Sequence, residues 1–130
     1  MNKISEENDL DVSASSAGIF ANEGESASEE AIEVMREDYD INISEHKARL
    51  LTDTLISEND VILTMTEAHK KIIETLAPKK VFTIAEYAGG NGEVSDPFGG
   101  DLCDYRETAE EIYDFLTDIA ERIADMEIND

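Results

Sequence analysis

Two short apolar runs on either side of a helix-like segment constrain the fold of this chain more than any other feature. The first run covers residues 60–65 and the second covers residues 80–84. Thr66 opens a segment that is predicted to be helical as far as Leu76, and Pro78 ends it. Because parallel strands need a crossover connection, a strand, a helix and a strand of this length indicate a parallel pair. The sequence therefore predicts an α/β fold with a parallel sheet.

The last part of the chain carries one apolar stripe. Its members recur alternately four and three residues apart and are Tyr105, Ala109, Ile112, Leu116, Ile119, Ile123 and Met126. This spacing predicts a terminal helix of about five or six turns, and it would also suit a coiled coil. Packing of the helix on the sheet is favoured, because the stripe is short for a coiled coil and strands alternate with helices upstream.

The first forty residues are less regular. Residues 1–11 are expected to be the remainder of a helix or a disordered start, and residues 12–21 alternate in a way that predicts a short strand leading into a loop. Ser26 and Glu29 have the spacing of a capping box, so a helix is predicted over about residues 27–38.

The chain is strongly acidic, with 32 acidic residues against 10 basic ones and a formal net charge of -22. Such a charge disfavours bare nucleic acid and anionic membranes as partners, and it is read as a solvated surface in preference to a site for basic partners. The single cysteine, Cys103, cannot form an intramolecular disulfide, and the start of the chain lacks the apolar run of a signal peptide. A cytoplasmic protein is expected.

Four stretches occur in the order and spacing of a known family: residues 15–21 (SSAGIFA), 44–49 (SEHKAR), 60–69 (DVILTMTEAH) and 96–100 (DPFGG). Over residues 12 to about 124, the chain resembles the low-molecular-weight protein-tyrosine-phosphatase family. The Phe-Gly-Gly continuation and the stretch from Val81 to Tyr87 are most similar to the bacterial branch that includes protein-arginine phosphatases.

The resemblance implies a doubly wound parallel sheet flanked by helices, with the active site at the carboxyl ends of the strands. It places this domain over residues 12–126, before a tail at 127–130. It also implies that the family's first strand, its phosphate-binding loop and most of its first helix are missing here. We therefore expect an isolated chain that is destabilised or partly molten, with an uncovered sheet position that could promote association. The oligomeric state cannot be read from the sequence.

The chemistry of the family needs a thiolate nucleophile, amides and an arginine that hold the phosphoryl oxygens, and an acid for the leaving group. The first two come from a C-x5-R loop at the start of the family's first helix. Cys103 is followed six positions later by Ala109, so this loop is absent from the sequence. Cys103 is expected to be a thiol near the start of the last helix with no assigned chemistry.

Asp96 is the residue that the resemblance singles out. By itself Asp96-Pro97 would be read as a turn, but the resemblance implies that Asp96 is the general acid and base. Phe98 would wall the pocket and guide the substrate side chain, with a structural anchor as the alternative. Ser16 and His46 could each serve a local turn, whereas the resemblance implies that they brace the phosphate-binding loop from outside the reacting atoms. No metal site and no cofactor are expected.

The resulting expectation is a protein phosphatase that hydrolyses phosphotyrosine or phosphoarginine through a cysteinyl-phosphate intermediate, with a phosphorylated protein as its substrate. The 130-residue chain as it stands is expected to be inactive, because the nucleophile is absent. The alternative is a non-catalytic binding module on a phosphatase scaffold. Arsenate reductases share the scaffold, but one cysteine cannot relay the electrons that they need.

Overall fold

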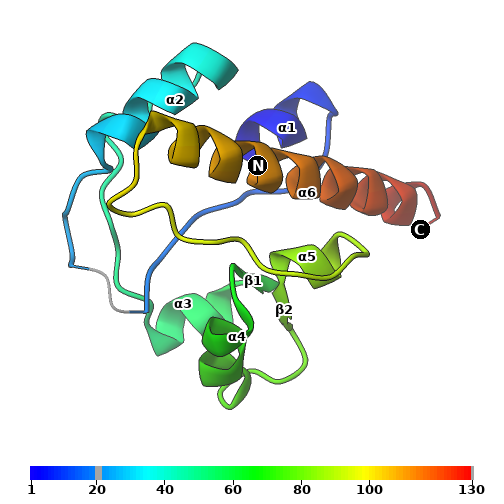
Figure 1. Ribbon diagram of the computed structural model, residues 1–130. Coiled ribbons are helices and arrows are strands. Elements are labelled where there is room, and N and C mark those ends of the chain that lie inside the picture. The colour runs from blue at the N-terminus through cyan, green and yellow to red at the C-terminus, as the bar shows by residue number, and fades with distance from the viewer. Residues whose placement is uncertain (20–21, 130) are drawn as a thin grey trace. The chain divides into compact units, whose positions relative to one another are not determined.

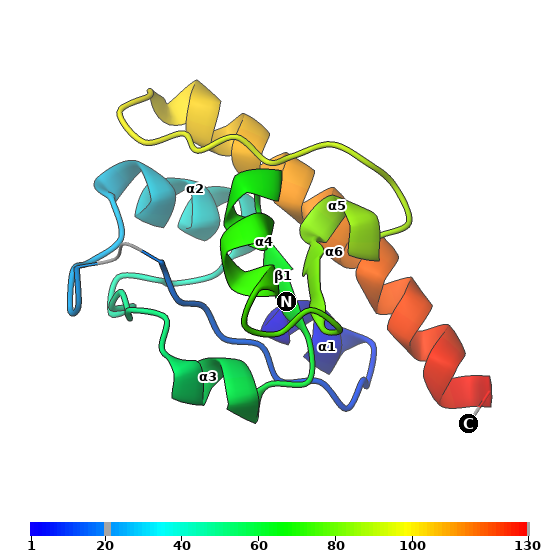
Figure 2. The same cartoon turned by 90° about the horizontal axis from the view of Figure 1, so that it is seen from below.

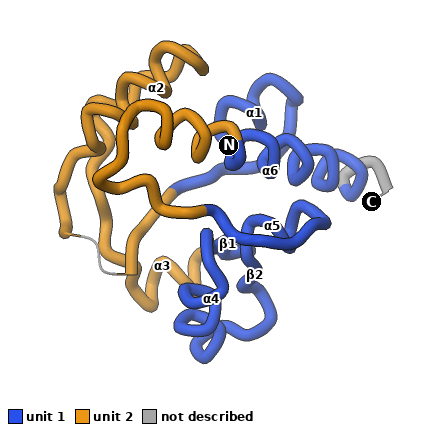
Figure 3. Tube along the Cα trace, viewed as in Figure 1, with its two compact units in different colours: residues 1–15, 60–94, 111–130 blue, residues 16–59, 95–110 orange. Residues whose placement is uncertain are grey.

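The computed structural model describes residues 1–19 and 22–129, with no account of the side chains beyond residue 126. Its elements are α1 (Asn2–Glu7), α2 (Glu29–Tyr39), α3 (Asp53–Glu58), β1 (Ile62–Thr64), α4 (Glu67–Glu74), β2 (Val81–Thr83), α5 (Ile84–Tyr87) and α6 (Leu102–Asn129) (Figure 1). They form two compact units, which Figure 3 shows in different colours. Unit 1 comprises residues 1–15, 60–94 and 111–130, and unit 2 comprises residues 16–59 and 95–110. None of the described helices is long and apolar enough to cross a membrane.

Unit 1 contains the strand–helix–strand arrangement that the apolar runs predict. β1 and β2 are parallel, with Ile62 opposite Val81 and Thr64 opposite Thr83. Thr66 caps α4 as expected, accepting a hydrogen bond from the amide of His69. α4 lies against the strand pair in both Figure 1 and Figure 2. The predicted α/β fold with a parallel sheet is confirmed. Both strands are shorter than their apolar runs, and α4 ends at Glu74, before the predicted end at Leu76.

The core of unit 1 joins three distant parts of the sequence. Ile84 from α5, Val94 from the segment after it and Ile119 from α6 are each at most 3% exposed and form one buried cluster. The part of α6 in unit 1 therefore packs into this core through four members of the predicted stripe, Ile112, Leu116, Ile119 and Ile123, as favoured over a coiled coil. The helix also runs on through residues 127–129, which the sequence assigned to a tail.

Side chains of α1 hold the segment that follows it. The Asn2 amide donates to the Ala14 carbonyl at 2.8 Å and accepts from the Ala14 amide at 2.7 Å. The Ser5 hydroxyl lies 2.9 Å from the Leu10 carbonyl and 3.0 Å from that of Val12. The predicted strand over residues 12–21 is wrong for most of its described part, residues 12–19. Among these residues Gly18 forms an isolated parallel bridge with Leu50, whereas the side chain of Asn2 bonds both main-chain groups of Ala14. Residues 20 and 21 lie outside the described chain.

Unit 2 begins its first helix two residues later than the sequence suggests. Ser28 is the N-cap of α2 and accepts from the Ala31 amide, so the capping box predicted for Ser26 and Glu29 is wrong. Ser26 instead accepts a hydrogen bond from the Lys47 ammonium at 2.7 Å. A tertiary contact has therefore taken the hydroxyl that the sequence assigned to the cap.

Glu86 provides a test of the pH dependence of unit 1. Its carboxylate accepts from Lys70 at 2.9 and 3.0 Å and from the Thr83 amide at 3.1 Å. The bond from Lys70, followed by that from Thr83, lowers the pKa of Glu86, and Glu86 raises the pKa of Lys70. A lowered carboxyl pKa contributes stability that is present above the ordinary value of 4.5 and is lost as the pH falls through the folded value.

We expect Glu86→Gln to lower the urea midpoint by a constant amount from pH 7 down to about pH 5, and by a decreasing amount below that. Urea titrations of both proteins across this range measure the difference. Glu74→Gln is the matched control, since Glu74 lies 4.0 Å from the same ammonium and is more exposed. A difference that grows on acidification would contradict the assignment.

Candidate active site

Ser16 and His46 lie together in unit 2, although thirty positions separate them. The Ser16 hydroxyl is 3.4 Å from Nε2 of His46, and both residues are exposed. The His46 amide donates to the Ile43 carbonyl, which closes a turn before the histidine. The structure thus brings together the two residues that the resemblance placed in one supporting role.

Arg49 ties the Ser16 segment to the segment that carries His46. Its Nε and Nη2 atoms donate to the Ser16 carbonyl at 3.3 and 3.2 Å. The Gly18 amide donates to the Arg49 carbonyl at 2.8 Å, and the Leu51 amide donates to the Gly18 carbonyl at 2.9 Å. Sequence reasoning did not single out Arg49, although the residue lies in the same SEHKAR stretch as His46.

The segment of His46 is also held along residues 23–26. The Gly24 amide donates to the Ala48 carbonyl at 2.9 Å, and the Ala48 amide donates to the Glu25 carbonyl at 2.8 Å. The carboxylate of Glu23 accepts from the Leu50 amide at 2.7 Å. Residues 46–51 therefore lie between two segments of unit 2 and bond to both.

Asp96 lies in a tight exposed turn. Its Oδ1 atom accepts from the amide of Phe98 at 3.0 Å, and the Gly100 amide donates to the Pro97 carbonyl at 2.8 Å. Gly99 has a φ of +82°, in the left-handed region that favours glycine. The bond from Phe98 orients the carboxyl group of Asp96 while leaving the residue open to solvent.

Phe98 projects from this turn with 85% of its surface exposed. With this exposure, the ring makes little packing contact among the described residues.

The turn leads into α6 through a reciprocal cap. The Asp104 amide donates to Oδ1 of Asp101 at 3.0 Å, and the Asp101 amide donates to Oδ2 of Asp104 at 3.1 Å. Carboxylates at this end of a helix are favourable, because its free amides and its dipole attract negative charge. Cys103 lies in this first turn and is exposed.

All four predicted site residues belong to unit 2. The Ser16 hydroxyl contacts Nε2 of His46, and the carboxylate of Asp96 accepts a hydrogen bond from the Phe98 amide. No hydrogen bond among the described residues joins the first pair to the second. The described residues also contain no group of His, Cys, Asp and Glu that could hold a metal ion.

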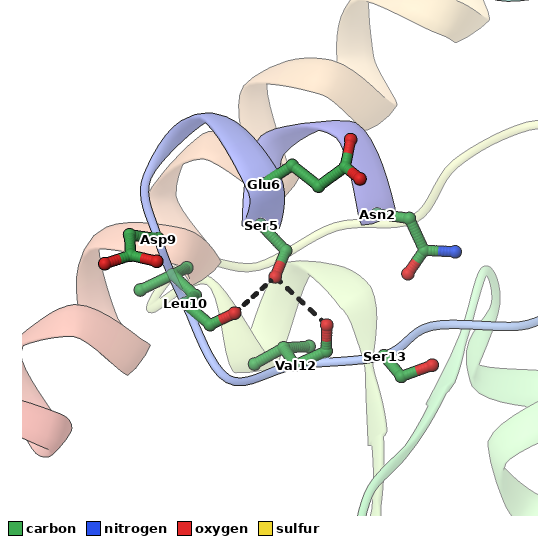
Figure 4. A pocket seen from close by; sticks show the side chains of 7 residues that line it. All are labelled: Asn2, Ser5, Glu6, Asp9, Leu10, Val12 and Ser13. Carbon is green, nitrogen blue, oxygen red and sulfur yellow. Dashed lines mark hydrogen bonds between the residues drawn. The ribbon is translucent and has the colours of Figure 1, made fainter.

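An open pocket of about 550 Å³ lies in unit 1, between α1 and the segment after it (Figure 4). Its lining includes Ser5, Glu6, Asp9 and Ser13 and none of the four site residues. The Ser5 hydroxyl is turned toward the carbonyls of Leu10 and Val12. The lining of this pocket therefore shares no residue with the candidate site.

Comparison with known proteins adds to this geometry. The family described as low molecular weight phosphotyrosine protein phosphatase matches residues 1–127 of the chain. A protein-arginine-phosphatase from Bacillus subtilis is 36% identical over 124 residues, which cover 92% of this chain and 81% of that protein. The low molecular weight protein-tyrosine-phosphatase PtpB of Staphylococcus epidermidis is 38% identical over 109 residues, or 82% of this chain and 76% of PtpB. The crystal structure of a low molecular weight protein tyrosine phosphatase from T. tengcongensis superposes with a TM-score of 0.88 at 39% identity, covering 93% of this chain and 84% of that one.

Proposed function

The chain belongs to the low molecular weight phosphotyrosine protein phosphatase family, and from that membership we propose that it acts in hydrolysing a phosphorylated protein side chain, either phosphotyrosine or phosphoarginine. The observation that carries the proposal is the turn at Asp96, whose carboxyl group is oriented by the Phe98 amide and open to solvent. A general acid needs both an aimed carboxyl group and access to the leaving atom.

Asp96 acts twice in the proposed reaction. A thiolate attacks phosphorus, the bond from phosphorus to the leaving oxygen or nitrogen breaks, and the Asp96 carboxyl group gives that atom its proton. The Asp96 carboxylate then takes a proton from water as the water attacks the cysteinyl phosphate. The sulfur–phosphorus bond breaks, and inorganic phosphate leaves.

The other three residues support this chemistry. Phe98 guides the substrate side chain, and its 85% exposure leaves the ring available for that contact. Ser16 and His46 brace the loop that binds the phosphoryl oxygens, as the 3.4 Å contact between them allows.

We propose that the nucleophile comes from a segment other than these 130 residues. The sequence has one cysteine, Cys103, and Ala109 stands where a C-x5-R loop would need arginine. Without the thiolate and the amides of that loop, the 130-residue polypeptide has negligible phosphatase activity by itself. Its proposed location is the cytoplasm, where phosphorylated proteins would be its substrates.

The test compares the 130-residue chain with a fusion in which a strand, a C-x5-R loop and a helix start precede it. Both proteins are assayed with p-nitrophenyl phosphate and with a phosphoarginine peptide. We expect no turnover by the chain alone and measurable turnover by the fusion, which Asp96→Asn lowers by about 10²–10⁴-fold. Asp114→Asn, on the exposed face of α6, is the control and should leave turnover unchanged.

Turnover by the 130-residue chain alone, abolished by Asp96→Asn, would overturn the proposal that the nucleophile lies elsewhere. A non-catalytic binding module is the second candidate, favoured by the absence of a C-x5-R stretch from the sequence. This module would leave the fusion inactive, while the chain alone would still bind a phosphorylated protein.

A further inference from the structure

Ser16 and His46 are both exposed, so burial does not hold either side chain in place. Their separation of 3.4 Å is near the long end of a hydrogen bond, where a small displacement breaks the contact. Something other than core packing must therefore set the position of Ser16 with respect to His46.

The side chain of Arg49 is the group that bonds the main chain of Ser16. Two atoms of its guanidinium, Nε and Nη2, donate to the carbonyl oxygen of Ser16, the same residue whose hydroxyl faces His46. Among the described residues, these two bonds are the hydrogen bonds made by the Ser16 main chain. The planar guanidinium fixes both donors in one fork, which restrains direction as well as distance.

Arg49 also differs from the other paired arginine of unit 2. Arg106 donates to the carboxylates of Glu37 and Asp38 at 2.6 and 3.2 Å. Arg49 donates to a neutral carbonyl instead, although the chain contains 32 acidic residues that could pair with an arginine. The contact of Arg49 is therefore specific to one backbone position, not an exchangeable charge pair.

We propose that Arg49 is a positioning residue that sets the Ser16 hydroxyl against Nε2 of His46. The inference rests on the proposed function for its importance, because Ser16 and His46 matter to catalysis only if they brace the phosphate-binding loop. Arg49 acts through Ser16 and does not itself touch the reacting atoms.

The imidazole nitrogens report this contact directly. The chain has two histidines, His46 and His69, so ¹⁵N spectra of the labelled 130-residue protein contain two imidazole pairs. Ser16→Ala first defines the change in the His46 Nε2 shift when the hydroxyl is removed. His69, which is exposed on α4 in unit 1, is the internal reference.

We expect Arg49→Met to reproduce at least about half of the Nε2 change caused by Ser16→Ala, with no change at His69. Arg49→Lys should give a smaller change in the same direction, since one ammonium cannot replace the two-donor fork. The double variant Ser16→Ala with Arg49→Met should match Ser16→Ala alone. Arg106→Met is the matched control and should leave the shift of His46 at its native value.

A native His46 shift in folded Arg49→Met would overturn the proposal, even if the unfolding midpoint fell, because a merely structural role moves stability alone. If Arg49→Met does not fold, Arg49→Lys decides, and a native His46 shift in that variant rejects the role. This result is independent of the turnover test. An unchanged His46 Nε2 shift would reject the role of Arg49 without contradicting the proposed reaction. Turnover by the chain without a C-x5-R segment would contradict the proposed source of the nucleophile without contradicting the role of Arg49.

Discussion

Ile119→Ala is expected to lower the free energy of unfolding by about 2–5 kcal/mol, the largest stability effect that we anticipate for one substitution. Ile119 is 2% exposed and packs with Ile84 and Val94. Removing most of its side chain takes apolar surface out of the core and leaves a cavity among groups from three segments. A native domain is stable by only about 5–15 kcal/mol, so this loss would remove a large part of the margin.

Urea unfolding followed by circular dichroism measures the change. Ile119→Val should cost about 0.5–1.5 kcal/mol, because it removes one methylene from the same place. Ile72→Ala on α4 is the exposed control, with 46% of Ile72 open to solvent, and should stay within about 0.5 kcal/mol of the native chain. Equal losses for Ile119→Ala and Ile72→Ala would contradict the assignment of the core.

Gly100→Ala is expected to lower the free energy of unfolding by about 1–3 kcal/mol and to disturb the turn that carries Asp96. A Cβ atom at this position would lie 2.9 Å from Cβ of Asp104 and 2.9 Å from the Pro97 carbonyl oxygen, and closer still to Oδ2 of Asp104. Oδ2 of Asp104 accepts from Asp101 in the α6 cap, and the Pro97 carbonyl accepts from Gly100 in the turn. Relieving the overlap would therefore weaken both hydrogen bonds.

Two glycines separate this crowding from other effects of adding a methyl group. Gly90 has an ordinary φ and its nearest neighbour would lie 3.7 Å away, so Gly90→Ala should change stability by less than about 0.5 kcal/mol. Gly24 has a φ of +82° and open space around it. Gly24→Ala should therefore lower the free energy of unfolding by about 1–2 kcal/mol through the left-handed backbone conformation alone. Urea midpoints give the stabilities, and amide shifts over residues 96–104 report the turn. If Gly100→Ala and Gly90→Ala had the same urea midpoint and the same amide shifts over residues 96–104, the proposed crowding at Gly100 would be refuted.

The parts of the fold that could be predicted are those in which neighbouring residues decide the structure. The runs at 60–65 and 80–84 became β1 and β2, Thr66 caps α4, and the stripe ending near Met126 became α6. Each of these depends on periodicity or on a cap within a few residues.

Two errors lie where a distant group bonds a residue to which the sequence pattern gave a local role. Ser26 has the spacing of a capping residue, but Lys47 donates to its hydroxyl and Ser28 caps α2. Residues 12–19 alternate like a strand, but Asn2 bonds both main-chain groups of Ala14. A pattern along the chain does not contain the position of Lys47 or Asn2.

The candidate site divides in the same way. Asp96, Phe98, Ser16 and His46 could be named from the sequence because their stretches resemble a family, and that resemblance is carried by residue identity. The 3.4 Å contact between Ser16 and His46 and the role of Arg49 required the tertiary structure, whereas the Asp96 carboxyl group is oriented within its own turn by the Phe98 amide. Arg49 binds a backbone carbonyl, which every residue has, so no partner side chain in the sequence could reveal it. The sequence by itself determined the family, the parallel α/β fold and the absence of a C-x5-R stretch, because these depend on residue type and spacing. Only the tertiary structure decided which distant side chains meet, because contacts such as Ser16 with His46 and Arg49 with Ser16 depend on how segments thirty or more residues apart are brought together.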